Sequence, residues 1–153
     1  MTDGEEKNEQ KELAERFEKM LNTNEHSFFD VTEFEELVEY YLDNNNIKNA
    51  LKVIEIAAEQ YPYSVLFIIR KAQILASMNQ TQEALNFLGK AEAMEPNNYE
   101  ILMSRGAVYS QMGLSEQAIE NFKLALPIAE FQDEVYLNVA FEFENTSRYG
   151  DAI

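Results

Sequence analysis

The sequence contains no cysteine and no tryptophan, and His26 is its only histidine. Without cysteine the chain cannot form disulfides, thiolate zinc sites or a cysteine nucleophile. A single histidine leaves few partners for a metal cluster or a nucleophile–base pair, and glycine-rich phosphate loops are also missing from the sequence. We therefore expect a protein that is not an enzyme and that has no catalytic residues, no metal site and no cofactor.

Long apolar runs and basic residues are also scarce. No apolar run is long enough to span a bilayer, and the polar, acidic N-terminus does not resemble a secretory signal. Lys and Arg number 12 against 28 Asp and Glu, which gives a net charge of −16. Such a charge repels nucleic-acid phosphates and anionic lipids, so we expect neither a nucleic-acid nor a membrane partner. We expect a soluble, cytoplasmic protein whose acidic residues serve first as a solubilising coat.

A repeat of 34 residues runs through the chain from about residue 31. Alanines recur at this spacing in two columns, which are Ala50, Ala84, Ala118 and Ala152, and Ala57, Ala91 and Ala125. Bulky residues recur in register with them, as Phe34, Ile68, Leu102 and Tyr136, and as Tyr41, Leu75, Tyr109 and Phe143. A column of smaller residues contains Val38, Ala72, Gly106 and Ala140. Within each repeat the apolar spacing of i, i+3, i+4 and i+7 predicts two amphipathic helices.

Polar residues mark the predicted helix starts. The first helices of the repeats follow candidate N-caps at Asp30, Ser64 and Asn98, and Glu33 completes a capping box with Asp30. Thr81 and Ser115 are the candidate N-caps of two second helices.

Other residues mark the predicted turns and helix ends. The turns between paired helices contain Asn45, Asn79, Gly113 and Ser147, of which serine tolerates a left-handed backbone least. Pro127 predicts that the second helix of the third repeat ends early or kinks.

These residues resemble the tetratricopeptide repeat, whose pattern is W-x₂-L-G-x₂-Y…A-x₃-F…P. The first repeat matches it with Phe34-x₂-Leu37-Val38-x₂-Tyr41, then Ala50-x₃-Ile54 and Pro62. Lys71 and Arg105 depart from the pattern, because they replace its leucine. The resemblance implies an all-α fold, a right-handed superhelical solenoid of antiparallel helix pairs, here with an additional N-terminal helix.

The repeat divides the chain into predicted segments. They are a disordered acidic tail over 1–8, a capping helix and loop over 9–30, three repeats over 31–64, 65–98 and 99–132, and an incomplete fourth repeat over 133–153. The capping helix is predicted at about 8–21, with Leu13, Phe17, Met20 and Leu21 on its apolar face. Because no helix is left in the sequence to cover the apolar residues of the fourth repeat, we expect this chain to be the N-terminal part of a longer repeat protein.

The family resemblance also implies a ligand surface, because first helices of such repeats line a concave groove. The implied groove residues are Glu35, Glu39, Leu66, Ile69, Gln73, Glu100, Met103, Ala107, Gln111, Leu137, Phe141 and Glu144. Apolar side chains occupy the middle of this surface and carboxylates flank them. We expect a protein–protein interaction scaffold whose groove binds a partner segment with apolar anchors and basic flanks. Alternatively, Ile69, Met103 and Leu137 only pack between neighbouring helix pairs.

Other functions remain open at this point. One branch of the family binds the acidic tails of heat-shock chaperones with several basic residues, but the corresponding places here contain only one cation, Arg70, so we do not expect that ligand. The chain could instead be a structural spacer in a larger repeat protein whose ligand or catalytic site lies beyond residue 153. Self-association through the C-terminal end is a further alternative, and it predicts a dimer that a charged residue in place of Phe143 disrupts.

Overall fold

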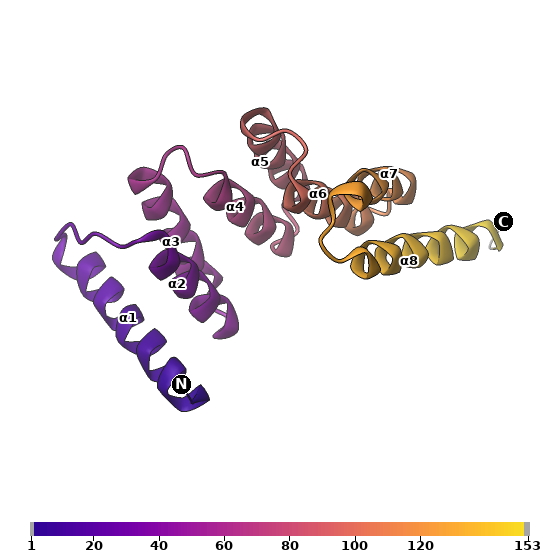
Figure 1. Cartoon of the computed structure of the whole chain (residues 1–153). Coiled ribbons are helices and arrows are strands. Elements are labelled where there is room, and N and C mark those ends of the chain that lie inside the picture. The colour runs from indigo at the N-terminus through magenta and orange to yellow at the C-terminus, as the bar shows by residue number, and fades with distance from the viewer. Residues whose placement is uncertain (1, 152–153) are drawn as a thin grey trace. The chain divides into compact units, whose positions relative to one another are not determined.

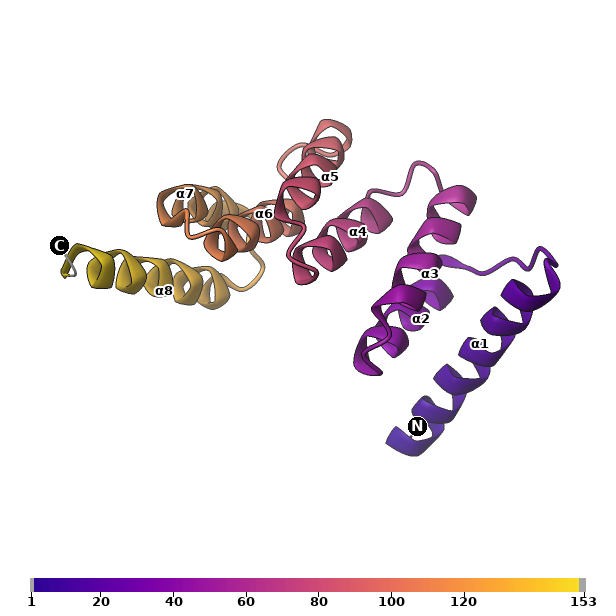
Figure 2. The ribbon, with the colours of Figure 1, turned by 180° about the vertical axis from the view of Figure 1, so that it is seen from behind.

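The computed structural model describes the backbone of residues 2–151 and the side chains of residues 2–147. These residues form an all-α fold without strands (Figures 1 and 2). The helices are α1 (Asp3–Thr23), α2 (Val31–Asp43), α3 (Ile47–Gln60), α4 (Val65–Ser77), α5 (Thr81–Met94), α6 (Tyr99–Gln111), α7 (Ser115–Ala125) and α8 (Gln132–Asp151), and the short 3-10 helix η1 (Leu126–Ile128) follows α7. The chain divides into two compact units, Met1–Phe67 and Ile68–Ile153, with the division inside α4.

Helix α1 begins at Asp3, so the prediction of a disordered tail over 1–8 is wrong for the described residues 3–8. The reason lies in the chemistry of the first turn. The backbone N–H of Thr2 donates to the Glu5 carboxylate at 3.1 Å, and the acidic residues Asp3, Glu5 and Glu6 stand at the positive end of the helix dipole. The acidic residues that favoured disorder therefore stabilise the start of a helix.

Helix α1 packs against α2 in the first unit. Its buried residues are Leu13, Ala14, Phe17 and Met20, which include three of the four apolar residues predicted to face inward. The Phe17 ring lies 6.0 Å from that of Phe29 and 6.1 Å from that of Tyr41. The apolar face of α1 thus covers the side of α2 that would otherwise be exposed at the start of the array.

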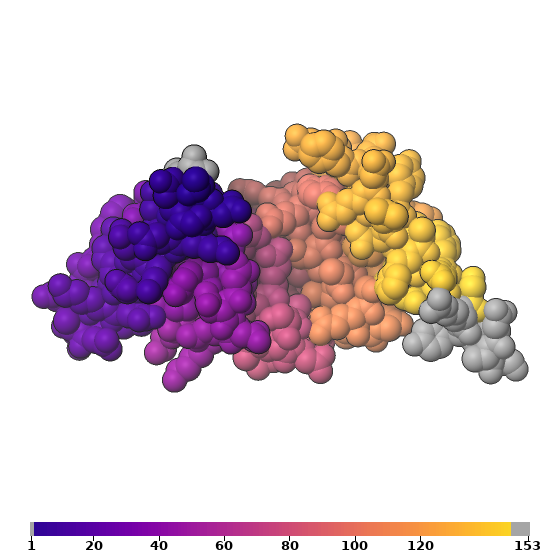
Figure 3. Space-filling model, turned by 90° about the horizontal axis from the view of Figure 1, so that it is seen from below, coloured from indigo at the N-terminus to yellow at the C-terminus, as the bar shows by residue number. Residues whose placement is uncertain are grey.

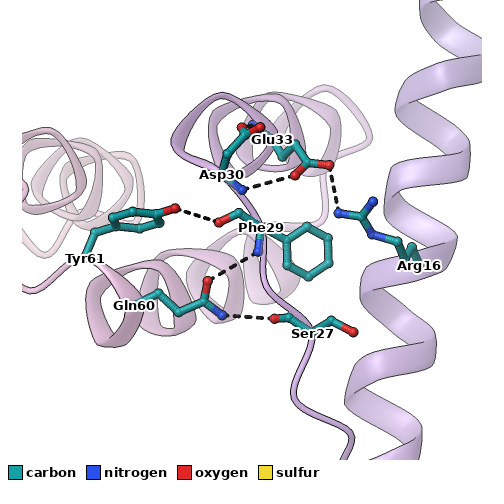
Figure 4. A network of polar contacts seen from close by, with 7 residues as sticks. All are labelled: Arg16, Ser27, Phe29, Asp30, Glu33, Gln60 and Tyr61. Atoms are coloured by element: carbon teal, nitrogen blue, oxygen red, sulfur yellow. Dashed lines mark hydrogen bonds and ion pairs between the residues drawn. The ribbon is translucent and has the colours of Figure 1, made fainter.

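The loop between α1 and α2 is fixed by a polar network around Phe29 (Figure 4). Gln60 of α3 donates to the Ser27 carbonyl at 3.0 Å, and the Tyr61 hydroxyl donates to the Phe29 carbonyl at 2.9 Å. From α1, the guanidinium of Arg16 lies 4.3 Å from the Phe29 ring centroid. The loop therefore joins α1 to the first helix pair through a buried ring and paired backbone groups.

The predicted N-caps are partly confirmed. Asp30 and Glu33 form the predicted capping box, with hydrogen bonds of 2.8 and 3.1 Å, and the Asn98 side chain accepts from the first turn of α6. Thr81 and Ser115 do not cap, because each is already the first residue inside its helix. A cap requires a non-helical backbone just before the helix.

The predicted turns are confirmed at three positions. Asn45, Asn79 and Gly113 have φ values of 59°, 62° and 76°, the left-handed backbone that Asn and Gly adopt most readily. The turn predicted at Ser147 is wrong, because α8 continues through this residue. A left-handed backbone is sterically less favourable for serine than for glycine, so this residue does not end the helix. Ala152 and the side chain of Tyr149 lie outside the described residues.

Gly106 explains the close approach of α6 and α7 in the second unit. A Cβ atom at this position would lie 2.4 Å from Cε1 of Phe122 and 2.7 Å from its Cδ1. Phe122 is buried with Ala118 and Val135 in one apolar cluster. The missing side chain at 106 therefore leaves the space that the aromatic ring fills.

Helix α7 is shorter than α3 and α5, as Pro127 predicts. The helix ends at Ala125, and the chain continues as η1 with proline in its first turn. Proline has no backbone N–H to donate and its ring clashes with the preceding turn.

The two basic residues that depart from the repeat pattern are accommodated by side-chain partners. The Lys71 ammonium lies 4.6 Å from the Phe87 ring centroid, and Arg105 forms an ion pair with Glu92. Both side chains are half-buried, and their charged groups reach these partners. A leucine at these positions is therefore not needed for packing.

Candidate functional site

The second unit contains a cavity of about 570 Å³. Helix α6 contributes half of its lining, and α4, α5, α7 and α8 contribute the rest. The lining residues are Ala72, Gln73, Ala76, Leu88, Tyr99, Glu100, Met103, Ser104, Ala107, Val108, Gln111, Phe122, Glu134 and Asn138.

Small residues make this surface hollow. Ala72 and Ala76 on α4 and Ala107 on α6 offer only a methyl group where longer side chains would fill the space. Behind them, the buried side chains of Leu88 and Phe122 form an apolar floor. The cavity therefore combines an apolar base with an open mouth, which is the usual form of a ligand pocket.

A hydrogen-bonded network forms the polar wall between α4 and α6. Arg70 pairs with Glu100 and also donates to the Gln73 side chain at 2.9 Å. Gln73 in turn donates to the Ser104 hydroxyl at 3.0 Å. Because the Glu100 carboxylate is neutralised by Arg70, this wall presents amide and hydroxyl groups more than charge.

The opposite wall comes from α8 and the start of α6. The Tyr99 hydroxyl donates to Glu134 Oε2 at 3.1 Å. Burial, followed by this bond to a carboxylate, raises the pKa of Tyr99 above its usual range. Asn138 lies one turn further along α8 and donates to the Glu134 carbonyl at 2.9 Å. Glu134 thus places a negative charge at this side of the cavity mouth.

Gln111 closes one end of the cavity. Its side-chain amide donates to the Ala76 carbonyl at 2.9 Å and to Asn79 Oδ1 at 3.2 Å. Ala76 lies in the last turn of α4, and its carbonyl also accepts from the backbone N–H of Asn79, which lies in the turn that follows the helix. The bond therefore links α6 to α4 and fixes the spacing of the two helices that flank the cavity.

The structure brings together part of the predicted groove. Five predicted residues line the cavity, and they are Gln73, Glu100, Met103, Ala107 and Gln111. Leu137 and Phe141 do not line it, but both are exposed on α8, at 72% and 55% of their surface. Glu144 is also exposed on α8 and is not among the lining residues.

The remaining predicted residues do not line the cavity. Ile69 is only 2% exposed, so it is a core residue and does not offer the apolar anchor that the sequence suggested. Its side chain falls on the buried side of α4, whereas Gln73 one turn later is half-exposed. Glu35, Glu39 and Leu66 belong to the first unit, where Glu39 is exposed and the other two are half-buried.

Tyr99 and Asn138 are among the polar lining residues that the predicted groove does not include. Asn138 stands 34 residues after Ser104, which itself follows Arg70 by the same step. The repeat could therefore have indicated Asn138 as a groove residue. Tyr99 gave no such signal, because its equivalent in the preceding repeat is the buried Val65.

Among the described residues, no three His, Asp or Glu side chains lie close enough together to hold a metal ion. Among the same residues, no helix is long and apolar enough to cross a membrane.

Glu142 on α8 is a buried carboxylate, with only 1% of its surface exposed. One of its oxygens accepts from the Ser110 hydroxyl, while Oε2 has no hydrogen-bond partner among the described residues.

Comparison with known proteins identifies the repeats. Residues 67–98 and 99–131 match the tetratricopeptide repeat family model. A tetratricopeptide repeat and J domain-containing co-chaperone, DNJ1 of Fusarium oxysporum f. sp. lycopersici, is 33% identical over 73 residues, which are 48% of this chain and 14% of that protein.

Solved structures share the fold at low sequence identity. A crystal structure of MamA is 18% identical, covers 95% of this chain and 78% of its own, and superposes with a TM-score of 0.72. The structure of YrrB, described as a TPR protein with an unusual peptide-binding site, is 21% identical, covers 85% and 66% of the two chains, and has a TM-score of 0.69.

Proposed function

Because residues 67–131 are tetratricopeptide repeats, we propose that this chain is a protein-interaction module whose second-unit cavity binds a segment of a partner protein. The observation that carries the proposal is the hollow made by Ala72, Ala76 and Ala107 over an apolar floor. Its volume lies within the range of about 300–1,000 Å³ that is typical of ligand pockets. A peptide-binding site is also named in the description of YrrB, which has the same fold. We propose binding without catalysis.

An apolar anchor of the partner enters the hollow. Met103 lines the cavity and is half-buried, so its flexible side chain adapts to anchors of different shapes. Leu137 and Phe141, which are exposed on α8, extend the apolar surface beyond Asn138 at the cavity wall. Burial of such anchors supplies most of the affinity.

Polar groups around the mouth bind the main chain of the partner segment. Gln73, Gln111 and Asn138 present amide side chains from three different helices. Most of their N–H groups already donate within the protein, so their amide oxygens are the main groups left to accept from the backbone N–H groups of an extended peptide. This arrangement favours an extended segment over a segment whose backbone groups are already paired in a helix.

Basic flanks of the partner face Glu134. Among the described residues this carboxylate forms no ion pair, and the Tyr99 hydroxyl that donates to it is neutral. Glu100, in contrast, is already paired with Arg70. A net charge of −16 also attracts a basic segment over distances of about 10 Å at 0.1 M salt. Charge therefore speeds encounter and selects partners, while the apolar anchor holds them.

A displayed library of short random peptides tests this proposal directly. The chain is the target, and selected peptides are then measured against Ala107→Arg, which fills the cavity and adds a positive charge. Ala93→Arg is the matched control, because Ala93 is exposed on α5 and does not line the cavity. We expect peptides with an apolar residue beside Lys or Arg whose binding is lost in Ala107→Arg and kept in Ala93→Arg.

Two results would contradict the proposal. If no peptide is enriched, the chain is better explained as a spacer. If both arginine variants bind the selected peptides equally, the ligand site lies elsewhere. The electrostatic part is tested separately with Glu134→Gln and with salt raised from about 0.1 to 1 M, and affinity that does not change in either case removes it.

A further inference from the structure

The first unit contains a cavity of its own, with a volume of about 390 Å³. It is lined by the end of α1, which is indigo to violet in Figure 3, by the loop that follows, and by the C-terminal part of α3. Ser27 and Gln60, joined by the 3.0 Å hydrogen bond drawn in Figure 4, are among the lining residues. This first-unit cavity has the size of a ligand pocket, about 300–1,000 Å³, and shares no lining residue with the second-unit cavity.

The floor of the first-unit cavity is apolar. Met20 is only 8% exposed, and Leu21 and Ile56 are half-buried. Met20 and Leu21 belong to α1, whereas Ile56 belongs to α3. Such a floor suits the aliphatic stem of a long side chain whose charged end stays at the rim.

The rim carries negative charge. Glu25 in the loop and Glu59 on α3 both line the cavity, and no lysine or arginine does so. Both carboxylates are exposed, and among the described residues neither forms an ion pair or accepts a hydrogen bond. His26 also lines the cavity from the exposed loop. The negative potential at this site therefore comes from residues of the cavity itself.

The end of α1 adds main-chain acceptors. Among the described residues, no backbone N–H that follows α1 donates to a carbonyl of its last turn, which includes Met20 and Leu21. At the end of α3, in contrast, the Tyr61 N–H donates to the Ala57 carbonyl at 2.8 Å. The last turn of α1 also contains no basic residue. Carbonyls without a donor at a helix C-terminus favour a positively charged donor.

An exposed aromatic ring stands next to this cavity. Phe28 directly follows the lining residue Ser27 and is 72% exposed. Its ring centroid lies 6.0 Å from that of Tyr61, which directly follows the lining residue Gln60. The ring pair therefore offers apolar surface on which a neighbour of a bound charged residue can pack.

We propose that the first-unit cavity binds an arginine side chain of a partner protein, while an apolar residue near that arginine packs on Phe28. The arginine stem lies on the apolar floor. Its planar guanidinium has five N–H donors for the two carboxylates and the free carbonyls of α1, whereas a lysine ammonium has three. A guanidinium is also more weakly hydrated than an ammonium, which favours it in a partly buried site.

The probe is a pentapeptide with arginine at its centre, glycine on both sides and leucine at both ends. A second peptide has citrulline in place of arginine, which keeps the shape and removes the charge. Binding to the whole ¹⁵N-labelled chain is followed by NMR through the chemical shifts of its backbone amides. We expect shifts that concentrate at residues 20–28 and 56–61, and an affinity about tenfold lower for the citrulline peptide.

Variants separate the local carboxylates from the general acidity of the chain. Glu25→Gln and Glu59→Gln each weaken binding of the arginine peptide severalfold. Glu55→Gln is the matched control and keeps it, because Glu55 is exposed one turn earlier on α3 and does not line the cavity. Phe28→Ser also weakens binding, whereas Ala107→Arg, which fills the second-unit cavity, leaves it unchanged. Circular dichroism and the midpoint of thermal unfolding establish that each variant is folded.

Four outcomes would overturn the proposal. The arginine peptide shifts none of the cavity residues, or the citrulline peptide binds as tightly. Glu25→Gln and Glu59→Gln behave like Glu55→Gln, or binding is lost in Ala107→Arg because the probe occupies the second-unit cavity. Unchanged binding in Phe28→Ser would remove the protein partner and leave a site for a free guanidinium compound.

Discussion

Replacing Gly106 by alanine is predicted to destabilise the protein, although alanine is the better helix former. Gly106 lies inside α6, where the change to alanine alone would stabilise the helix by about 1 kcal/mol. The new Cβ would, however, lie 2.4 Å from Cε1 of Phe122, against an optimal carbon–carbon distance of about 3.5–4.0 Å. Phe122 is 2% exposed, so its ring cannot move into solvent.

The net effect follows from these opposing contributions. Overpacking of a buried site costs about 1–3 kcal/mol, and the short distance places this contact toward the upper part of that range. The ring borders the cavity, which offers some room for relaxation. After the gain in helix propensity is subtracted, we expect the free energy of unfolding to fall by about 1–2 kcal/mol. This loss lowers the Tm by roughly 2–8 °C for a chain of this size.

The assay is urea and thermal unfolding followed by circular dichroism, with two controls. Gly89→Ala lies in α5 with nothing within 4 Å of the new Cβ, so it should stabilise the protein by about 0.5–1 kcal/mol. The double change Gly106→Ala with Phe122→Leu should recover most of the loss, because it recreates the Ala72 and Leu88 pair of the preceding repeat. If Gly106→Ala is as stable as the unmodified chain, or shifts in the same direction as Gly89→Ala, the packing argument is refuted.

Three further changes test other parts of the structure. Glu142→Val should raise the free energy of unfolding, measured in urea titrations, by about 1–3 kcal/mol. The change replaces a buried carboxylate with valine, the residue found 34 positions earlier at Val108. A less stable variant would show that the Glu142 carboxylate has its hydrogen-bond partners in solution. Gly113→Ala should cost about 1–2 kcal/mol in the same assay, because φ is +76° there, and an unchanged midpoint would contradict the turn geometry. Burial and the hydrogen bond to Glu18 raise the pKa of Tyr41 above its ordinary value of 10, so the stability it contributes is complete below pH 10 and falls as pH rises further. Above about pH 10, the urea midpoint of the Tyr41→Phe variant should fall less steeply with pH than that of the unmodified chain. If the two midpoints fall in parallel, Tyr41 does not cause the loss of stability at high pH.

Much of the fold could be predicted because the 34-residue repeat constrains every level of the structure. The alanine columns and the i, i+3, i+4, i+7 spacing located the helix pairs, and Asn45, Asn79 and Gly113 located three of the turns. The errors came where one local signal competed with another. Acidic residues before Glu9 suggested a solvated tail, but the same charges stabilise a helix N-terminus.

The candidate site was less predictable, since a cavity depends on which side of each helix is buried. Gln73 and Met103 could be placed because the resemblance implied that first helices line the groove. Ile69 could not be separated from them by sequence, because it lies only one helical turn from the half-exposed Gln73 and yet is buried. The apolar floor of the cavity, which includes Phe122, comes from the second helices of the repeats. It could be predicted only if the packing of those helices were known.

Site-specific alkylation tests most directly whether the second-unit cavity binds a peptide segment. Because the chain has no cysteine, Ala107→Cys and Ala93→Cys each introduce a single exposed thiol, the first in the cavity lining and the second outside it. The measurement is the rate of modification by N-ethylmaleimide with and without a library-selected peptide at saturating concentration. We expect the peptide to slow alkylation at position 107 and to leave position 93 unchanged. Equal rates at position 107 with and without bound peptide would contradict the assignment of the cavity as the binding site.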